Sequence, residues 1–324
     1  MARELAAQFL ALAEKHGATI LLVVGHRLMG SSLLHTGNIA QGRAHYDQSI
    51  AFYDPIEHRP LATRFGHDNR VAALAFRSLA HWVLGYPEAA NADIQQTLNY
   101  AREIGQAATL MVALTCTCWT HIPCGNYGVA TRQIEEAVAL ADEKAAPFWK
   151  ALGMMNQGWL FALNSKSAHA VHMLTSGIIA YRSTGATLLL PLYLSHLAKA
   201  HAELGQFDDA WRSIGEAMTE IATTKDRWQE AEVHRVAGEI ALMSPGAGTA
   251  EAEAYFERAL GIAREQQAKS WELRATMSVA RLRRDQGKPQ QARDLLAPVY
   301  GWFTEGFDTL DLKQAKALLE ELTS

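Results

Sequence analysis

Four side chains of the kinds that bind zinc lie within nine residues of one another, at Cys116, Cys118, His121 and Cys124. Thiolates and imidazoles are the ligands of structural zinc sites. On a helix, however, Cys116 and Cys118 project about 200° apart, which disfavours their binding one ion. Cys118, His121 and Cys124 could share one stripe of the helix. We therefore interpret the cysteines as core residues beside a polar histidine, with a metal site as the alternative.

Other catalytic signatures are missing from the sequence. Residues 153–158 (GMMNQG) are followed by Trp159, where a phosphate-binding loop needs Lys and then Ser or Thr. No Gly-x-Ser-x-Gly elbow occurs, and the 13 histidines are scattered rather than set beside a nucleophile or paired carboxylates. We expect no catalytic residue, no metal and no cofactor. A hydrolase or metalloprotein centred on residues 116–124 is the minor alternative.

Composition narrows the class of protein further. The chain of 324 residues is 49% hydrophobic, enough for a large core, and its net charge of -4 offers no basic surface for nucleic acid or membranes. The longest apolar run, residues 19–25, is far shorter than the roughly 20 residues of a membrane span. The N-terminus does not resemble a signal peptide, and three cysteines suit a reducing compartment. We expect a cytoplasmic protein.

Small residues recur along the chain at intervals of about 40 residues. A second small residue follows each of them 12 positions later, and a turn signal usually lies between the two. Two antiparallel helices approach closely only where the side chains at their crossing are small. The first series is Gly30, Ser78, Cys118, Gly158, Ala198, Gly238 and Ala280, and the second is Gly42, Ala90, Ala130, Ala170, Ala210, Ala250 and Ala292.

Each repeat therefore predicts a helix, a tight turn and a second helix. The apolar residues around these points have helical spacing, and no strand pattern occurs. We predict an all-α, tetratricopeptide-like α-solenoid of about seven helical hairpins with a period of roughly 40 residues. Unrelated hairpins packed in a bundle are the alternative.

The repeat register also suggests boundaries within the chain. Residues 1–18 match the second helix of a hairpin whose first helix does not precede them, so we expect a fragment that begins within an array. Residues 19–310 are the array itself. Residues 311–324 form an amphipathic segment suited to a C-terminal capping helix.

A concave groove is the expected binding surface. In tetratricopeptide arrays the first helix of each hairpin lines this groove, and positions three before and one after the small residue commonly face it. Residues 228–235 add the densest polar and aromatic patch. In the alternative interpretation the tryptophans are core between repeats and the charged residues form a solvated face. The groove candidates are Arg27, Trp119, Trp159, Lys199, Trp228, Arg235, Glu239 and Arg281.

The string PVYGWFTEGFDT within residues 296–312 is specific, because repeat packing does not require it. With several other segments, it resembles the C-terminal tetratricopeptide region of bacterial proteins that fuse a class III adenylate/guanylate cyclase domain to a signalling ATPase. The resemblance implies a regulatory array that serves cyclase and ATPase domains lying upstream in a longer protein. The other segments are residues 52–59, 82–87, 147–153 with 158–159, 231–235 with 238–239, and 268–274.

Two functional hypotheses follow. In the first, the chain is a non-catalytic sensor region of a signalling protein and captures a peptide, a protein or a small polar ligand in its groove. In the second, it is a structural oligomerisation scaffold without a ligand, and exposed apolar surface pairs two copies into a homodimer.

Overall fold

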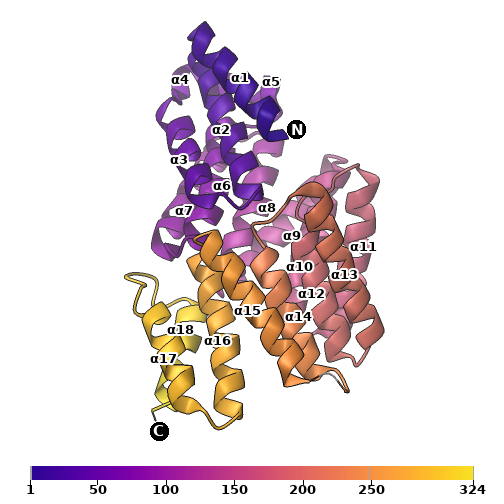
Figure 1. Ribbon diagram of the computed structural model, residues 1–324. Coiled ribbons are helices and arrows are strands. Elements are labelled where there is room, and N and C mark those ends of the chain that lie inside the picture. Colours follow the sequence, from indigo (N-terminus) through magenta and orange to yellow (C-terminus); the bar gives the residue numbers. More distant parts are fainter. Residues whose placement is uncertain (1, 247, 324) are drawn as a thin grey trace.

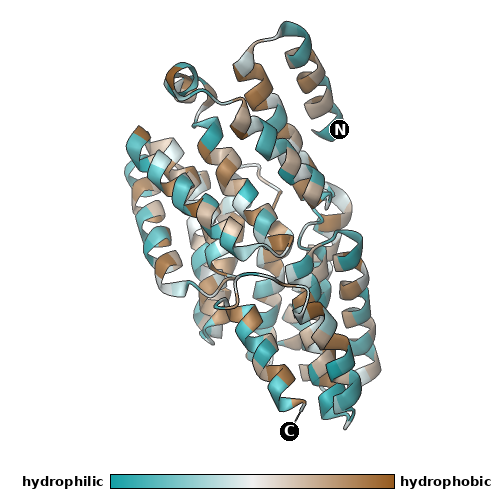
Figure 2. Cartoon of the chain, turned by 90° about the vertical axis from the view of Figure 1, so that its left-hand side faces the viewer, coloured by the Kyte–Doolittle hydropathy of each residue, from teal (hydrophilic) through white to brown (hydrophobic). Residues whose placement is uncertain are grey.

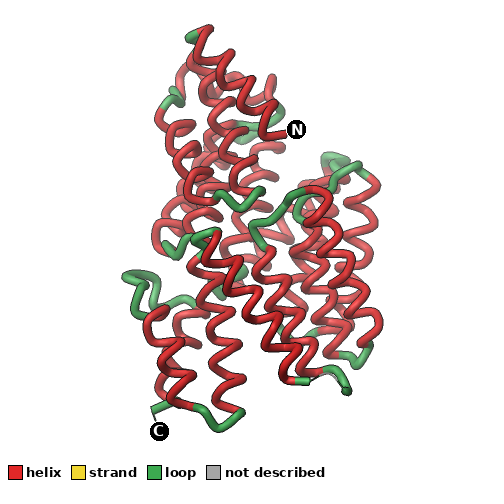
Figure 3. The backbone as a smooth tube through the Cα atoms, in the orientation of Figure 1, coloured by secondary structure: helices red, strands yellow, loops and turns green. Residues whose placement is uncertain are grey.

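The computed structural model describes residues 2–246 and 248–323, and these residues form helices and connecting turns without a strand (Figure 3). Seven helical hairpins follow one another in the described chain (Figure 1). The predicted all-α, tetratricopeptide-like solenoid is confirmed. The hairpins are α2 (Thr19–His35) with α3 (Ile39–Ala51), α6 (Asn69–Val83) with α7 (Pro87–Ile104), α8 (Ala107–His121) with α9 (Tyr127–Glu143), α10 (Pro147–Leu163) with α11 (Ser167–Ser183), α12 (Leu190–Glu203) with α13 (Phe207–Thr224), α14 (Glu230–Met243) with α15 (Thr249–Glu265), and α16 (Lys269–Asp285) with α17 (Pro289–Tyr300).

The remaining helices lie at the ends of the array and in one insertion. Helix α1 (Ala2–His16) packs on α2, and α18 (Leu310–Glu321) packs on α16 and α17. The interval between the small residues Gly30 and Ser78 is the longest of the series. Its extra residues form α4 (Pro55–His58), the 3-10 turn η1 (Arg59–Leu61) and α5 (Ala62–Phe65), which lie between the first two hairpins. None of the helices in the described residues is long and apolar enough to cross a membrane.

The small residues lie at helix crossings, as the repeat predicts. A Cβ atom on Gly30 would lie 2.8 Å from the ring of Tyr46 and 3.0 Å from the carbonyl oxygen of Gly42. A Cβ atom on Gly158 would lie 3.0 Å from the backbone nitrogen of Leu174. Larger side chains at these positions would force the paired helices apart.

The predicted position Ala250 is wrong. Ala250 is exposed, and Ala252, two residues later, is fully buried instead. The reason is the longer connection in this repeat, where α14 ends at Met243 and α15 begins at Thr249. An insertion in the turn shifts the second helix by two residues without changing its packing.

The first helices of the hairpins form an inner layer, and the second helices cover it. Helix α8 shows this most clearly, because every residue from Met111 to His121 is buried. The outer helices bury one stripe only, and hydrophilic and hydrophobic residues alternate along most helices in Figure 2.

The solenoid winds back on itself, so that the turns of the first three hairpins contact the last repeats. A Cβ atom on Gly37 would lie 2.8 Å from Gln266, one on Gly85 would lie 2.6 Å from Trp302, and one on Gly125 would lie 2.8 Å from Leu310. A side chain at any of these glycines would therefore crowd the facing segment, which would have to shift.

Aromatic and polar contacts hold this closure. Trp82 of α6 packs edge-to-face on Trp271 of α16, with ring centroids 4.7 Å apart, and Ser270 Oγ donates to the carbonyl oxygen of Trp82. Glu305 Oε1 accepts a 3.0 Å hydrogen bond from the backbone of Glu88 at the start of α7. We call this contact between the second hairpin and residues 269–306 the closure (Figure 1).

Candidate functional site

Four of the eight predicted groove residues meet in one cavity on the inner side of the array. Lys199 comes from α12, Arg235 and Glu239 from α14, and Arg281 from α16. The cavity has a volume of about 340 Å³. We call it the charged cavity. It is also lined by Tyr127, Leu163, Glu232, Arg274, Met277, Leu310, Asp311 and Gln314.

An ion-pair network forms the floor of the charged cavity. Arg235 donates to Glu232, with a distance of 2.7 Å from Nε to Oε2, and also pairs with Glu239. Lys199 Nζ lies 3.3 Å from Glu239 Oε2. Arg274 completes the network, because its Nη1 lies 3.4 Å from Glu232 Oε1. Arg235 and Glu232 are therefore mutually satisfied and fixed in place.

The electrostatics of the network follow from burial. Burial alone would raise the pKa of Glu232, but Arg235 and Arg274 outweigh it and hold that pKa at about 2. Burial raises the pKa of Asp311 despite its pairing with Arg274. Arg281 differs from the others, because it forms no ion pair within residues 2–246 and 248–323. The charged cavity therefore keeps one cation outside its ion pairs, although the charge of Glu239 acts on it.

Two other candidates, Arg27 and Trp119, lie together in a second inner cavity of about 310 Å³. Trp119 is nearly fully buried, and its Nε1 donates a 2.9 Å hydrogen bond to Tyr193 Oη. Arg27 Nε donates a 2.8 Å hydrogen bond to Asn69 Oδ1. The walls of this cavity are mainly apolar, unlike those of the charged cavity.

The last two candidates, Trp159 and Trp228, lie in the core between repeats. Each is 1% exposed. The ring of Trp159 stacks on His196, with centroids 5.0 Å apart, and Trp228 packs near Trp271 at 6.1 Å. The expectation that these two side chains face the groove is corrected: at these positions the tryptophan faces the next repeat, as in the alternative interpretation.

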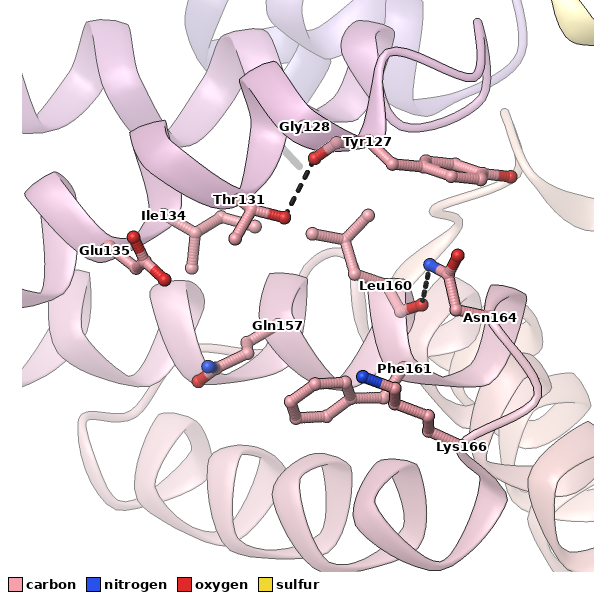
Figure 4. A pocket seen from close by; sticks show the side chains of 10 residues that line it. All are labelled: Tyr127, Gly128, Thr131, Ile134, Glu135, Gln157, Leu160, Phe161, Asn164 and Lys166. Carbon is pink, nitrogen blue, oxygen red and sulfur yellow. Dashed lines mark hydrogen bonds between the residues drawn. The ribbon is translucent and has the colours of Figure 1, made fainter.

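A third cavity, of about 420 Å³, was not anticipated by the repeat pattern. It lies between α9 and α10, and Figure 4 shows Tyr127, Thr131, Phe161 and Asn164 among its walls. Thr131 Oγ1 donates to the Tyr127 carbonyl oxygen at 2.8 Å, and Asn164 Nδ2 donates to the Leu160 carbonyl oxygen at 2.7 Å. These two polar groups are therefore already bonded to the backbone. Tyr127 lines both this cavity and the charged cavity.

The sequence missed the part of the charged cavity that comes from distant segments. Tyr127 follows the turn of the third hairpin, and Asp311 lies near the end of the chain. The two segments meet because the Leu310 amide donates to the Cys124 carbonyl oxygen at 3.2 Å. No signal within a repeat could reveal this meeting.

The cysteines lie where helix packing places them. Cys118 Sγ donates to the Leu114 carbonyl oxygen at 3.0 Å, and Cys116 lines the apolar cavity instead. Burial raises the pKa of all three thiols, that of Cys124 to about 12. Within the described ranges, no three His, Cys, Asp or Glu side chains are grouped so as to hold a metal ion.

Comparison with solved structures shows similarity to tetratricopeptide-type repeat proteins. A Rap conjugation gene regulator in complex with a peptide superposes with a TM-score of 0.64 at 10% identity, covering 96% of this chain and 77% of that chain. A Rap protein complexed with competence and sporulation factor gives 0.53 at 12% identity, covering 94% and 75%. A tetratricopeptide repeat protein from Parabacteroides merdae gives 0.50 at 11%, covering 94% and 99%. No family model and no curated protein matches the chain. At these identities the similarity shows the fold.

Proposed function

We propose that this chain is a regulatory binding array that captures a peptide segment in the charged cavity. The observation that carries the proposal is the convergence of four predicted groove residues, Lys199, Arg235, Glu239 and Arg281, from three successive inner helices. A rigid floor of ion pairs beside one unpaired arginine suits a polar ligand that carries a carboxylate.

The shape of the site favours a peptide over a compact ligand. Tyr127 lines both the charged cavity and the third cavity. An extended peptide bound in the charged cavity would therefore continue along α9 and α10 into the third cavity. Successive inner helices present contacts at regular intervals, which matches the regular spacing of a peptide backbone. Two of the similar solved structures contain a peptide or the competence and sporulation factor, which agrees with this choice.

The regulatory part of the proposal rests on the resemblance to cyclase and ATPase fusion proteins. In such a protein, a ligand that binds one arrangement of the array better than another would shift the equilibrium of the domains attached to it. The closure would distinguish two such arrangements, closed and open, because its contacts join residues far apart in the chain. The resemblance implies that cyclase and ATPase domains are the partners of the array.

The test is selection of peptides followed by measured affinities. A library of displayed peptides is panned against the chain, and fluorescence anisotropy then gives the dissociation constant of each selected peptide. We expect Arg281→Gln and Lys199→Gln each to weaken binding by about tenfold, the effect of losing one charge-assisted hydrogen bond. The matched control is Arg212→Gln on the outer helix α13, whose side chain is 72% exposed. Equal affinities for all three variants would contradict the proposal.

A further inference from the structure

The second inner cavity, which holds Arg27, differs from the charged cavity in the chemistry of its walls. Its walls come from the inner helices α2, α6, α8 and α10, from Tyr181 on the outer helix α11, from His67 before α6 and from the segment before α12. We call it the aromatic cavity. Its volume of about 310 Å³ is near the lower end of the range of small-molecule sites, roughly 300–1,000 Å³. Aromatic side chains in its lining are Phe76, Trp119, Phe148, Trp149 and Tyr181.

These rings pack on one another and leave faces towards the cavity. Phe76 lies 5.7 Å from Trp119, and Phe148 lies 4.9 Å from Trp149, measured between ring centroids. Trp119 is buried, whereas Phe76, Phe148 and Trp149 are only partly buried. Partly exposed aromatic faces around a cavity bind flat apolar groups well, because little ordering of the side chains is required.

One cation lies among these apolar walls. Arg27 uses its Nε for Asn69, and its terminal nitrogens have no carboxylate partner within the residues that the structure describes. Burial lowers the pKa of Arg27, but a guanidinium stays protonated at neutral pH. His67, also in the lining, carries no charge at neutral pH, because burial and the charge of Arg27 lower its pKa to about 4. The aromatic cavity therefore has a net positive charge.

The carboxylate that pairs with His35 of the lining is already occupied. Asp226 is fully buried and accepts three hydrogen bonds: 2.8 Å from His35 Nδ1, 2.7 Å from the Leu189 amide and 3.1 Å from Gln229 Nε2. Leu189 adopts a left-handed backbone, with φ 70°, to make its bond. Asp226 is thus committed to joining α2 to the segment before α12 and does not neutralise Arg27.

An uncompensated cation in apolar surroundings is unfavourable unless an anion joins it. We infer that the aromatic cavity binds a small monocarboxylate with an apolar, preferably aromatic, body. The carboxylate pairs with the terminal nitrogens of Arg27, and the body lies between Phe76, Phe148 and Trp149. The same chemistry is offered by a free aryl-alkanoic acid and by the C-terminal residue of a peptide ending in an aromatic side chain. This site is separate from the charged cavity and does not depend on the function proposed for it.

The test is isothermal titration of the full chain at pH 7 with three probes. The probes are 3-phenylpropionate, its uncharged amide 3-phenylpropionamide, and N-acetylglycyl-phenylalanine. We expect the amide to bind at least about tenfold more weakly than the acid, because a charge-assisted hydrogen bond is lost. Tighter binding of the peptide than of the free acid would assign a peptide C-terminus, and weaker binding would assign a free acid.

Two arginine variants locate the site. Arg27→Gln should lower the affinity for 3-phenylpropionate by about tenfold or more, whereas Arg281→Gln in the charged cavity should leave it unchanged. For peptides selected against the charged cavity, the effects of the two variants should be reversed. The two proposals can therefore fail separately.

Equal affinity for acid and amide would overturn the inference, as would an affinity insensitive to Arg27→Gln or no binding at millimolar concentration. Circular dichroism checks that Arg27→Gln retains its helices. If that variant does not fold, the comparison of acid with amide on the unmodified chain still decides.

Discussion

Gly238 lies where α14 crosses α15, and a Cβ atom there would lie 2.5 Å from the ring of Phe256. Phe256 is fully buried and cannot move aside. We expect Gly238→Ala to lower the free energy of unfolding by about 1–3 kcal/mol through overpacking. Chemical denaturation measures this change.

The control for that substitution is Gly261→Ala. Gly261 also lies within a helix, but a Cβ atom there has no neighbour within 4 Å among the described residues. Alanine at an open helical position should raise the free energy of unfolding by about 1 kcal/mol. A change of the same sign in both variants would contradict the interpretation of the small residues as crossing points.

His196 gives a prediction about pH. Burial lowers its pKa to about 3, although Glu232 opposes the shift, and neither ring nitrogen has a hydrogen-bond partner within residues 2–246 and 248–323. In the unfolded chain His196 is therefore protonated as the pH falls through about 6.5, whereas in the folded chain it stays neutral down to about pH 3. Stability falls as the pH drops through this range.

Between pH 7 and pH 5 this single histidine should lower the free energy of unfolding by about 2 kcal/mol. In His196→Gln the loss between these two pH values should be smaller by that amount, and His172→Gln, on the exposed face of α11, should match the unmodified chain. Urea titrations at both pH values provide the comparison. The same loss in all three proteins would show that His196 is not buried in its neutral form.

Individual residues differ in how well the sequence predicts them. Gly30 and Gly158 could be identified because a repeated small residue has one main use in paired helices. Trp159 could not be assigned from its position, because the register that faces the groove at Lys199 faces the next repeat at Trp159. The size of the side chain decides: a tryptophan in a tightly packed inner layer contributes to the core, whereas a lysine extends to the cavity.

Hairpins were predicted better than the contacts between their turns. Gly85 and Gly205 occupy the same place in two hairpins, and both have a left-handed backbone, with φ 92° and 75°. They differ in their surroundings. A Cβ atom added to Gly85 would contact Trp302 and Lys269, whereas one added to Gly205 has no neighbour within 4 Å in the part of the chain that the structure describes. A sequence comparison of the two turns cannot distinguish them.

Substitutions at Gly85 and Gly205 separate the stability lost through strain in the turn from the stability lost through disruption of the closure. Gly205→Ala should lose roughly 1–2 kcal/mol of stability from backbone strain alone. Gly85→Ala should lose more, because the added methyl group also displaces Trp302. Hydrogen exchange should rise within residues 301–309 in Gly85→Ala only. Equal stability losses and unchanged exchange in both variants would show that the closure contributes little.

The array as a whole is more closed than its repeats indicate. Repeats specify contacts between neighbours, but the closure joins Trp82 to Trp271 and Glu88 to Glu305 across most of the chain. Winding accumulates from small rotations at each repeat, and no single residue reports it. The fold class was therefore predictable, whereas the division of the inner surface into a charged cavity and an aromatic cavity was not.

The closed form also explains why the candidate residues separate into groups. Arg27 and Trp119 lie in the early repeats, and Lys199, Arg235, Glu239 and Arg281 lie in the later ones. In the closed array, the inner surface is accessible at separate cavities, each with its own chemistry.

Hydrogen–deuterium exchange of the chain, with and without a saturating peptide selected from the library, tests the proposed binding surface without any substitution. We predict that exchange slows in α12, α14 and α16, in residues 310–314, and in α9 and α10 where the peptide continues into the third cavity. The outer helices α13 and α15 should be unchanged, because they line neither cavity. Slowing confined to α13 and α15, or no slowing at saturation, would contradict capture of a peptide on the inner surface.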